Sequence, residues 1–272
     1  MGYFEIADSI QLFYHLPSCE EDSLYLIFLH GGGGNRELWY NQVSYFQNKY
    51  KTVVFDLPGH GKVSSSEPLL DVPYSIKGIK DLIENEFINH PVVICGHSYA
   101  GFILFGLLKE SLPNLIGLIF LDCPYYKDVH EIQERINLAK RMLSLSPQKM
   151  ELITNQWYRN MTGGNLKDQD QKLILDSLSQ VNIEWMYKCM LHSKELLEIY
   201  PSKKQINESN IQFLIIEGEK SLFRSPDRSY RQALANSQYQ VIQNSNHFCF
   251  LEKPQIVNYF IKKFLEYLID SN

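Results

Sequence analysis

Short apolar runs alternate with longer amphipathic stretches along this chain. Five of the runs are almost entirely apolar and end at Gly, Asp or Pro: residues 24–30, 51–56, 91–96, 115–122 and 211–218. Such runs are typical of strands that are covered on both faces, as in a mostly parallel sheet. Residues 3–7 and 10–15 predict a short hairpin before the first run, and residues 239–243 predict a last strand.

Helical periodicity fills the stretches between these strands. The predicted helices cover about 37–48, 73–89, 99–110, 226–236 and 254–269. Alternation of strands and helices predicts an α/β fold with right-handed crossovers. The alternation stops between residues 125 and 208, where Met, Leu and Lys recur at helical spacing. We therefore predict a core domain formed by residues 1–124 and 209–272, with a helical cap (lid) subdomain at 125–208.

Composition narrows the classes of partner and the compartment. The chain has 272 residues, a net charge of −5 and a pI near 5.9, with no block of Lys or Arg. A nucleic-acid groove and stable membrane association are therefore not expected. We see no signal peptide and no apolar stretch of membrane-spanning length. The five cysteines are odd in number and irregularly spaced, which favours buried thiols and a cytoplasmic protein.

The strongest local signal is the segment VVICGHSYAGF, residues 92–102. It places G-x-S-x-G between an apolar strand and a helix. Small residues on both sides of Ser98 permit a sharp, strained turn that exposes the hydroxyl at the edge of the sheet. The alternative interpretation is a tight strand–helix turn with a capping serine. The strand before and the helix after it favour Ser98 as a nucleophile.

Two further segments carry candidate chemistry. FLHGGGGNRELWY (28–40) follows the first central strand, and its glycines let backbone N–H groups approach a ligand. We expect the amides of Gly32 and Tyr99 to bind an oxyanion together. NSNHFCFLEKP (244–254) follows the last strand, and His247 within it is the candidate general base for Ser98.

Taken together, these segments resemble the α/β-hydrolase fold family. The resemblance rests on HGGGG, DLPGHG (56–61), GHSYAG and NHFCFLEKP in this order, and it covers nearly the whole chain. It implies a serine nucleophile on a mostly parallel sheet flanked by helices, with an inserted helical cap. It says little about the substrate, because this fold hosts many chemistries.

The triad acid departs from the family pattern. In similar proteins it lies just past the penultimate strand, but here IIEGEKSLF has Ser221 at that position. Asp122 ends the strand after the nucleophile helix, where some branches of the family, such as haloalkane dehalogenases, carry their acid. We assign Asp122 as the acid, with Glu217 or the absence of a true acid as alternatives. Those dehalogenases attack with an aspartate, so the reaction is not carried over with the acid.

Other chemically active residues receive structural interpretations. We expect His30 and His60 to brace backbone, and no group of residues has convincing metal-ligand spacing. The aromatic and Met residues of the predicted cap are expected mainly to pack, with some contribution to a pocket: Trp157, Tyr158, Trp185, Met186, Tyr187 and Met190.

The leading hypothesis is a serine hydrolase of the carboxylesterase or thioesterase type. It would cleave an ester or thioester of a small to medium, largely apolar small molecule through Ser98, His247 and Asp122, without cofactor or metal. The same site could hydrolyse amide or C–C bonds, as in relatives resembling aminopeptidases or diketone hydrolases. A non-catalytic ligand-binding or signalling protein is the remaining class, and Ser221 is the feature that favours it.

Overall fold

The structure is a computed structural model of the chain. It describes residues 2–7, 10–14, 24–61, 71–124, 129–162, 166–224, 234 and 237–270, the first two ranges as backbone only. The predicted helix at 226–236 lies almost wholly outside the described residues.

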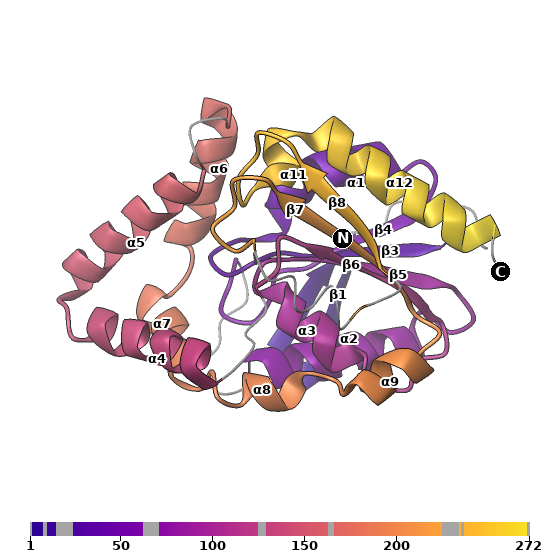
Figure 1. Cartoon of the computed structure of the whole chain (residues 1–272), viewed down its shortest axis with the longest axis horizontal. Helices are drawn as coiled ribbons and strands as arrows, with labels where there is room; N and C mark the ends of the chain where they lie inside the picture. Colours follow the sequence, from indigo (N-terminus) through magenta and orange to yellow (C-terminus); the bar gives the residue numbers. More distant parts are fainter. Residues whose placement is uncertain are drawn as a thin grey trace.

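Six parallel strands form the central sheet in the order β4-β3-β5-β6-β7-β8 (Figure 1). Their bounds are β3 (Tyr25–Leu29), β4 (Lys51–Val54), β5 (Val92–His97), β6 (Leu115–Leu121), β7 (Gln212–Gly218) and β8 (Gln238–Ile242). A separate antiparallel hairpin joins β1 (Gly2–Ala7) to β2 (Ile10–Tyr14). The predicted α/β fold with a mostly parallel sheet is confirmed.

Strand β5 shows why the apolar runs become central strands. Val92 and Ile94 face one buried cluster, whereas Val93 and Cys95 face a second cluster on the other side of the sheet. All four side chains are fully buried. Each large aliphatic side chain buried in this way contributes about 1.5–3 kcal/mol, so a continuous apolar run is stable only between two layers.

Helices cover both faces of this sheet. One face packs against α2 (Asp71–Asn85) and α3 (Ala100–Leu107), and the other against α1 (Tyr40–Phe46), α11 (Cys249–Glu252) and α12 (Pro254–Asp270) (Figure 1). The predicted helix at 37–48 begins as the 3₁₀ turn η1 (Arg36–Trp39). The side chain of Asn35 caps this turn by accepting a hydrogen bond from the amide of Glu37 at 2.9 Å.

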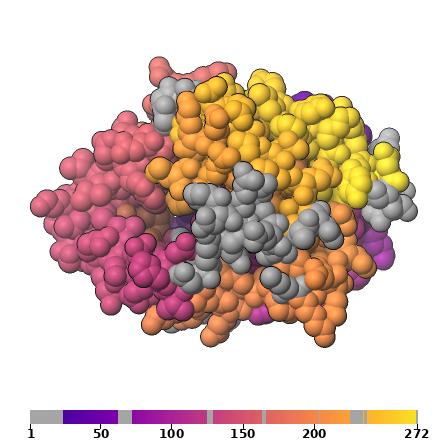
Figure 2. Space-filling view, viewed as in Figure 1, coloured from indigo at the N-terminus to yellow at the C-terminus, as the bar shows by residue number. Residues whose placement is uncertain are grey.

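The chain between β6 and β7 forms helices in its described part, which we call the helical insertion. Its helices are α4 (Val129–Leu143), α5 (Pro147–Met161), α6 (Asp168–Ser179), α7 (Ile183–Leu191), α8 (Leu196–Ile199) and α9 (Lys203–Glu208). Helices α4 to α7 occupy one end of the molecule and abut the C-terminal part of the core (Figure 2), while α8 and α9 return beneath α2 and α3 (Figure 1). The division into core and cap subdomains stays a prediction.

None of the helices in the described ranges combines the length and the apolar composition needed to cross a bilayer.

The order of the strands determines where a site can form. The chain passes from β3 to its neighbour β4 and then crosses back over β3 to β5 on the other side. Leu29 at the end of β3 pairs with Gly96 near the end of β5. The loops that follow these two strands therefore meet at one edge of the sheet, at the switch point where α/β proteins bind ligands.

Candidate active site

Ser98 occupies a strained turn between β5 and α3. Its φ of 53° lies in the left-handed region, which is uncommon for a residue with a side chain. The amide of Ser98 donates to the carbonyl of Leu121 at 3.0 Å, and its carbonyl accepts from the amide of Gly101 at 2.9 Å. A Cβ on Gly101 would lie 2.7 Å from Cβ of Cys123. The second glycine of G-x-S-x-G is therefore required for the helix to start this close to β6.

The glycine run after β3 borders the same turn. A Cβ on Gly31 would lie 2.8 Å from Cβ of Ser98, and one on Gly32 would lie 3.8 Å from Cβ of Tyr99. The carbonyl of Gly32 accepts a hydrogen bond from the hydroxyl of Tyr158 at 2.6 Å. The helical insertion, through α5, therefore contacts the loop whose amide was predicted to bind an oxyanion.

His247 and Asp122 come together although 125 residues separate them. Nδ1 of His247 lies 3.3 Å from Oδ1 of Asp122, and both side chains are buried. Asp122 has a φ of 49°, and its amide donates to the carbonyl of Ile216 at 2.8 Å. Asp122 is thus held at the junction of β6 and β7, behind the imidazole.

Ser221 holds this carboxylate. Its hydroxyl donates to Oδ1 of Asp122 at 2.5 Å, and the amide of Gly218 donates to Oδ2 at 2.9 Å. A buried carboxylate is stable only with such donors around it. Ser221, which occupies the usual acid position of the family pattern, therefore hydrogen-bonds the carboxylate that lies beside His247.

Glu217, the alternative acid, and the nearby Glu219 bind other groups. Glu217 accepts a hydrogen bond from the hydroxyl of Tyr239 at 2.6 Å and lies 3.9 Å from Nε of Arg224. Glu219 accepts from the amide of Asn244 at 2.9 Å. Within the described part of the chain, Asp122 is the carboxylate paired with His247.

Burial sets the protonation of the pair. It lowers the pKa of His247 to about 3 and raises the pKa of Asp122 to about 7, the latter against the hydrogen bonds from Ser221 and Gly218. The imidazole is therefore neutral near pH 7. When the imidazole carries its proton on Nδ1, which faces Asp122, its other nitrogen, Nε2, can accept a proton.

The histidine loop has two supports that the sequence analysis did not assign. Nε2 of His97 donates to the carbonyl of His247 at 3.0 Å, which ties the loop to the serine turn. The carboxylate of Glu252 accepts from the hydroxyl of Ser245 at 2.7 Å and from the amide of Asn246 at 3.0 Å. The Glu in LEKP was the only signal in the sequence for the second support.

His30 braces backbone in the way the sequence predicted. Its Nδ1 donates to the carbonyl of Gly31 at 2.8 Å, and its Nε2 accepts from the amide of Leu57 at 2.9 Å. It therefore links the loops after β3 and β4. His60 donates from Nδ1 to the carbonyl of Pro58 at 2.9 Å.

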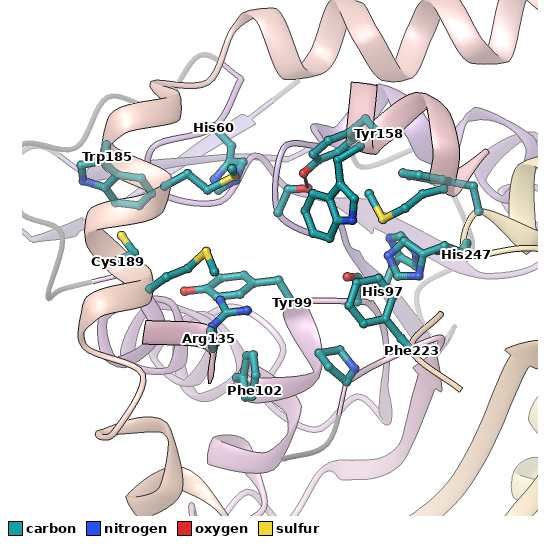
Figure 3. A pocket seen from close by; sticks show the side chains of 18 residues that line it. His60, His97, Tyr99, Phe102, Arg135, Tyr158, Trp185, Cys189, Phe223 and His247 are labelled. Carbon is teal, nitrogen blue, oxygen red and sulfur yellow. Dashed lines mark hydrogen bonds between the residues drawn. The ribbon is translucent and has the colours of Figure 1, made fainter. Parts of the chain in front are cut away.

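A cavity of about 90 Å³ lies where these segments meet (Figure 3). Ser98, His247, Gly32 and Tyr99 all line it, with helices α4, α5 and α7 of the insertion on its other walls. Of the six aromatic and Met residues expected mainly to pack, five line the cavity: Trp157, Tyr158, Trp185, Met186 and Met190. These residues therefore form a larger share of the pocket wall than the sequence predicted.

The predicted nucleophile Ser98 and the predicted base His247 lie on the same cavity without a hydrogen bond between them in the described structure. Catalytic hydrogen bonds are commonly long or misaligned before a substrate binds.

No group of three His, Cys, Asp or Glu side chains in the described ranges has a metal-binding arrangement.

The buried histidines predict a specific dependence of stability on pH. Burial lowers the pKa of His97 well below its usual 6.5. Below pH 6.5 the unfolded chain binds a proton at His97 that the folded chain does not, so the free energy of unfolding falls as pH falls. In His97→Gln this slope becomes shallower by up to about 1.4 kcal/mol per pH unit between pH 6.5 and 5. Urea unfolding at several pH values measures it.

His192→Gln is the matched control, because its side chain is 40% exposed. It measures how far the loss of an imidazole outside the core changes the slope. An unchanged slope in His97→Gln would contradict the assignment.

Comparison with known proteins gives the family. The chain is 23% identical over 247 residues to an (E)-2-((N-methylformamido)methylene)succinate hydrolase of Acinetobacter baylyi, covering 89% of this chain and 90% of that protein. It is 23% identical over 252 residues to a monoacylglycerol lipase of Bos taurus, covering 85% and 72%. The fold is similar to that of a thermophilic esterase from Thermogutta terrifontis, with a TM-score of 0.75, 18% identity and coverage of 95% and 94%. Residues 26–258 match the model of the alpha/beta hydrolase family, and the chain belongs to that family.

Proposed function

We propose that this protein is a serine hydrolase that cleaves an ester or thioester of a small to medium, largely apolar molecule. The observation that carries the proposal is the buried pair of His247 and Asp122, 3.3 Å apart, beside a cavity that Ser98 enters from a strained turn. A cavity of about 90 Å³ favours short acyl groups, since sites for drug-sized ligands measure roughly 300–1,000 Å³.

The proposed reaction begins with the hydroxyl of Ser98. It turns toward Nε2 of His247, gives up its proton there, and its oxygen bonds to the carbonyl carbon of the substrate. The negative charge that forms on the carbonyl oxygen is stabilised by the amides of Gly32 and Tyr99. The imidazolium then protonates the leaving oxygen or sulfur as its bond to carbon breaks.

Water completes the cycle. It gives a proton to Nε2 of His247 and adds to the acyl carbon, and the bond to Ser98 breaks as that proton returns to the serine oxygen. The products are a carboxylic acid and an alcohol or thiol. Asp122 stabilises the transient imidazolium and fixes its Nδ1 proton.

Amide hydrolysis by the same residues is the second candidate. The observation that favours it is the relative in Acinetobacter baylyi, since the substrate in its name carries an N-methylformamido group. A panel of matched esters, thioesters and N-methylformamides, compared by kcat/KM, separates the two reactions.

The first test concerns the nucleophile. Ser98→Ala should lower kcat/KM for 4-nitrophenyl butyrate by about 10³-fold or more, because it removes the proposed nucleophile. A fluorophosphonate probe, located by mass spectrometry, should label Ser98. Ser179→Ala, on the exposed side of α6, is the control and should keep both activity and labelling. Turnover retained in folded Ser98→Ala would disprove the mechanism.

The second test concerns the acid. Asp122→Asn should lower kcat by about 10²- to 10⁴-fold, since the imidazolium loses its counter-charge. Adding Ser221→Asp to this variant should restore part of the activity, because Oγ of Ser221 already lies 2.5 Å from the lost carboxylate oxygen. Glu217→Gln is the control and should change kcat little. The reverse pattern would assign the acid to Glu217.

The third test concerns the glycine loop. Tyr158→Phe removes the hydroxyl that binds the carbonyl of Gly32 and should lower kcat about 10-fold, with a smaller change in KM, because the oxyanion amides lose their alignment. Tyr187→Phe removes a comparably buried hydroxyl, 2.8 Å from Oγ1 of Thr154 within the insertion. An equal loss of kcat in both variants would show a general effect on packing.

A further inference from the structure

Among the described residues that line the cavity, one carries a permanent charge. Of the 18 described residues that line it, Arg135 is the only Lys, Arg, Asp or Glu (Figure 3). Three histidines also line it, but burial lowers the pKa of His60, His97 and His247. Near neutral pH the walls are therefore mostly apolar, with one guanidinium among them.

Two of the contacts that Arg135 makes help to hold its guanidinium in place. Nε of Arg135 donates to the hydroxyl of Ser193 at 2.9 Å, and this fully buried hydroxyl in turn donates to the carbonyl of Met190 at 2.6 Å. Cζ of Arg135 lies 6.0 Å from the centre of the ring of Phe102. Helix α4 thus directs a positioned cation toward α3, the helix that begins just after Ser98.

The position of Arg135 identifies the part of the substrate that it faces. His247 packs against Phe223, with ring centres 4.5 Å apart, whereas Arg135 lies near Phe102, across the cavity (Figure 3). In the proposed reaction His247 protonates the leaving group, so the leaving group lies on its side. The acyl group then extends toward Arg135.

We infer that Arg135 binds a carboxylate at the far end of the acyl group, so that the substrates are esters or thioesters of short dicarboxylic acids. The inference rests on the proposed hydrolase function. A guanidinium binds a carboxylate through two parallel N–H···O bonds, which are stronger than bonds between neutral groups. The apolar walls accommodate the methylene chain between the two carbonyl carbons, and they strengthen the ion pair by excluding water.

The test compares two esters with acyl chains of equal length. 4-Nitrophenyl hydrogen glutarate and 4-nitrophenyl valerate differ in that the first ends in a carboxylate and the second in a methyl group. The unmodified protein should have the higher kcat/KM for the glutarate. In Arg135→Gln the ratio of the two kcat/KM values should fall about 10- to 100-fold, the range expected for losing a charge-assisted pair. For Arg135→Lys, the ratio should lie between that of the unmodified protein and that of Arg135→Gln.

Arg141→Gln is the matched control. It removes a guanidinium from the same helix at an exposed position that does not line the cavity, and the ratio should stay unchanged. An equal ratio in the unmodified protein and in Arg135→Gln would overturn the inference and leave the hydrolase function standing.

A binding measurement separates the inference from the proposed function. If neither ester is turned over in a Ser98-dependent reaction, the proposed function fails. Calorimetry with Ser98→Ala then compares monomethyl glutarate with methyl valerate. Tighter binding of the glutarate that is lost on adding Arg135→Gln supports the carboxylate site, and equal binding of the two overturns it.

Discussion

The carboxylate of Asp122 is buried and needs hydrogen-bond donors around it. The geometry of the site depends on how the fold supplies these donors. A buried carboxylate without donors costs several kcal/mol, so the fold must supply them. The donors are the amide of Gly218, the hydroxyl of Ser221 and Nδ1 of His247. Gly218 is the last residue of β7, Ser221 lies in the loop after it, and His247 lies in the loop after β8. Satisfying one side chain at the end of β6 therefore fixes the relative positions of three loops at the same edge of the sheet.

This arrangement explains how the acid can occupy either of two strands. Strands β6 and β7 are parallel neighbours in register, with Leu121 opposite Ile216, and adjacent strands lie about 4.8 Å apart. A carboxylate at the end of either strand can therefore reach the same imidazole nitrogen. Here the β6 position holds Asp122, and Ser221 after β7 contributes a hydroxyl to it. A serine at 221 is thus compatible with an intact site, which weakens its value as a sign of lost catalysis.

The fold was predictable from the sequence because its signals are local. Apolar runs define the strands, and G-x-S-x-G between a strand and a helix defines the turn at Ser98. The long-range pairing of Asp122 with His247 was predicted only through the family resemblance, and other long-range contacts of the site were not predicted. The bond from His97 to the carbonyl of His247 joins residues 150 positions apart, and nothing near either residue encodes it. In the insertion, helical spacing predicted amphipathic helices but not which face meets the cavity, so Arg135 was missed and the lining aromatic residues were assigned mainly to packing.

The cavity wall has two parts, the loops of the core and the helices of the insertion, and different hydrogen bonds hold each part in place. The proposed catalytic groups lie on loops that the core itself braces, through His97 to the histidine loop and through His30 to the amide of Leu57. The wall across from His247 comes from α4, α5 and α7, and its bonds to the core include the one from Tyr158 to Gly32. Substitutions in these helices can therefore change the shape and charge of the acyl pocket while the bonds that align His247 stay intact. Within this family the chemistry can then remain fixed while the substrate changes, and in this chain the wall formed by α4, α5 and α7 is the part of the cavity that can vary in this way.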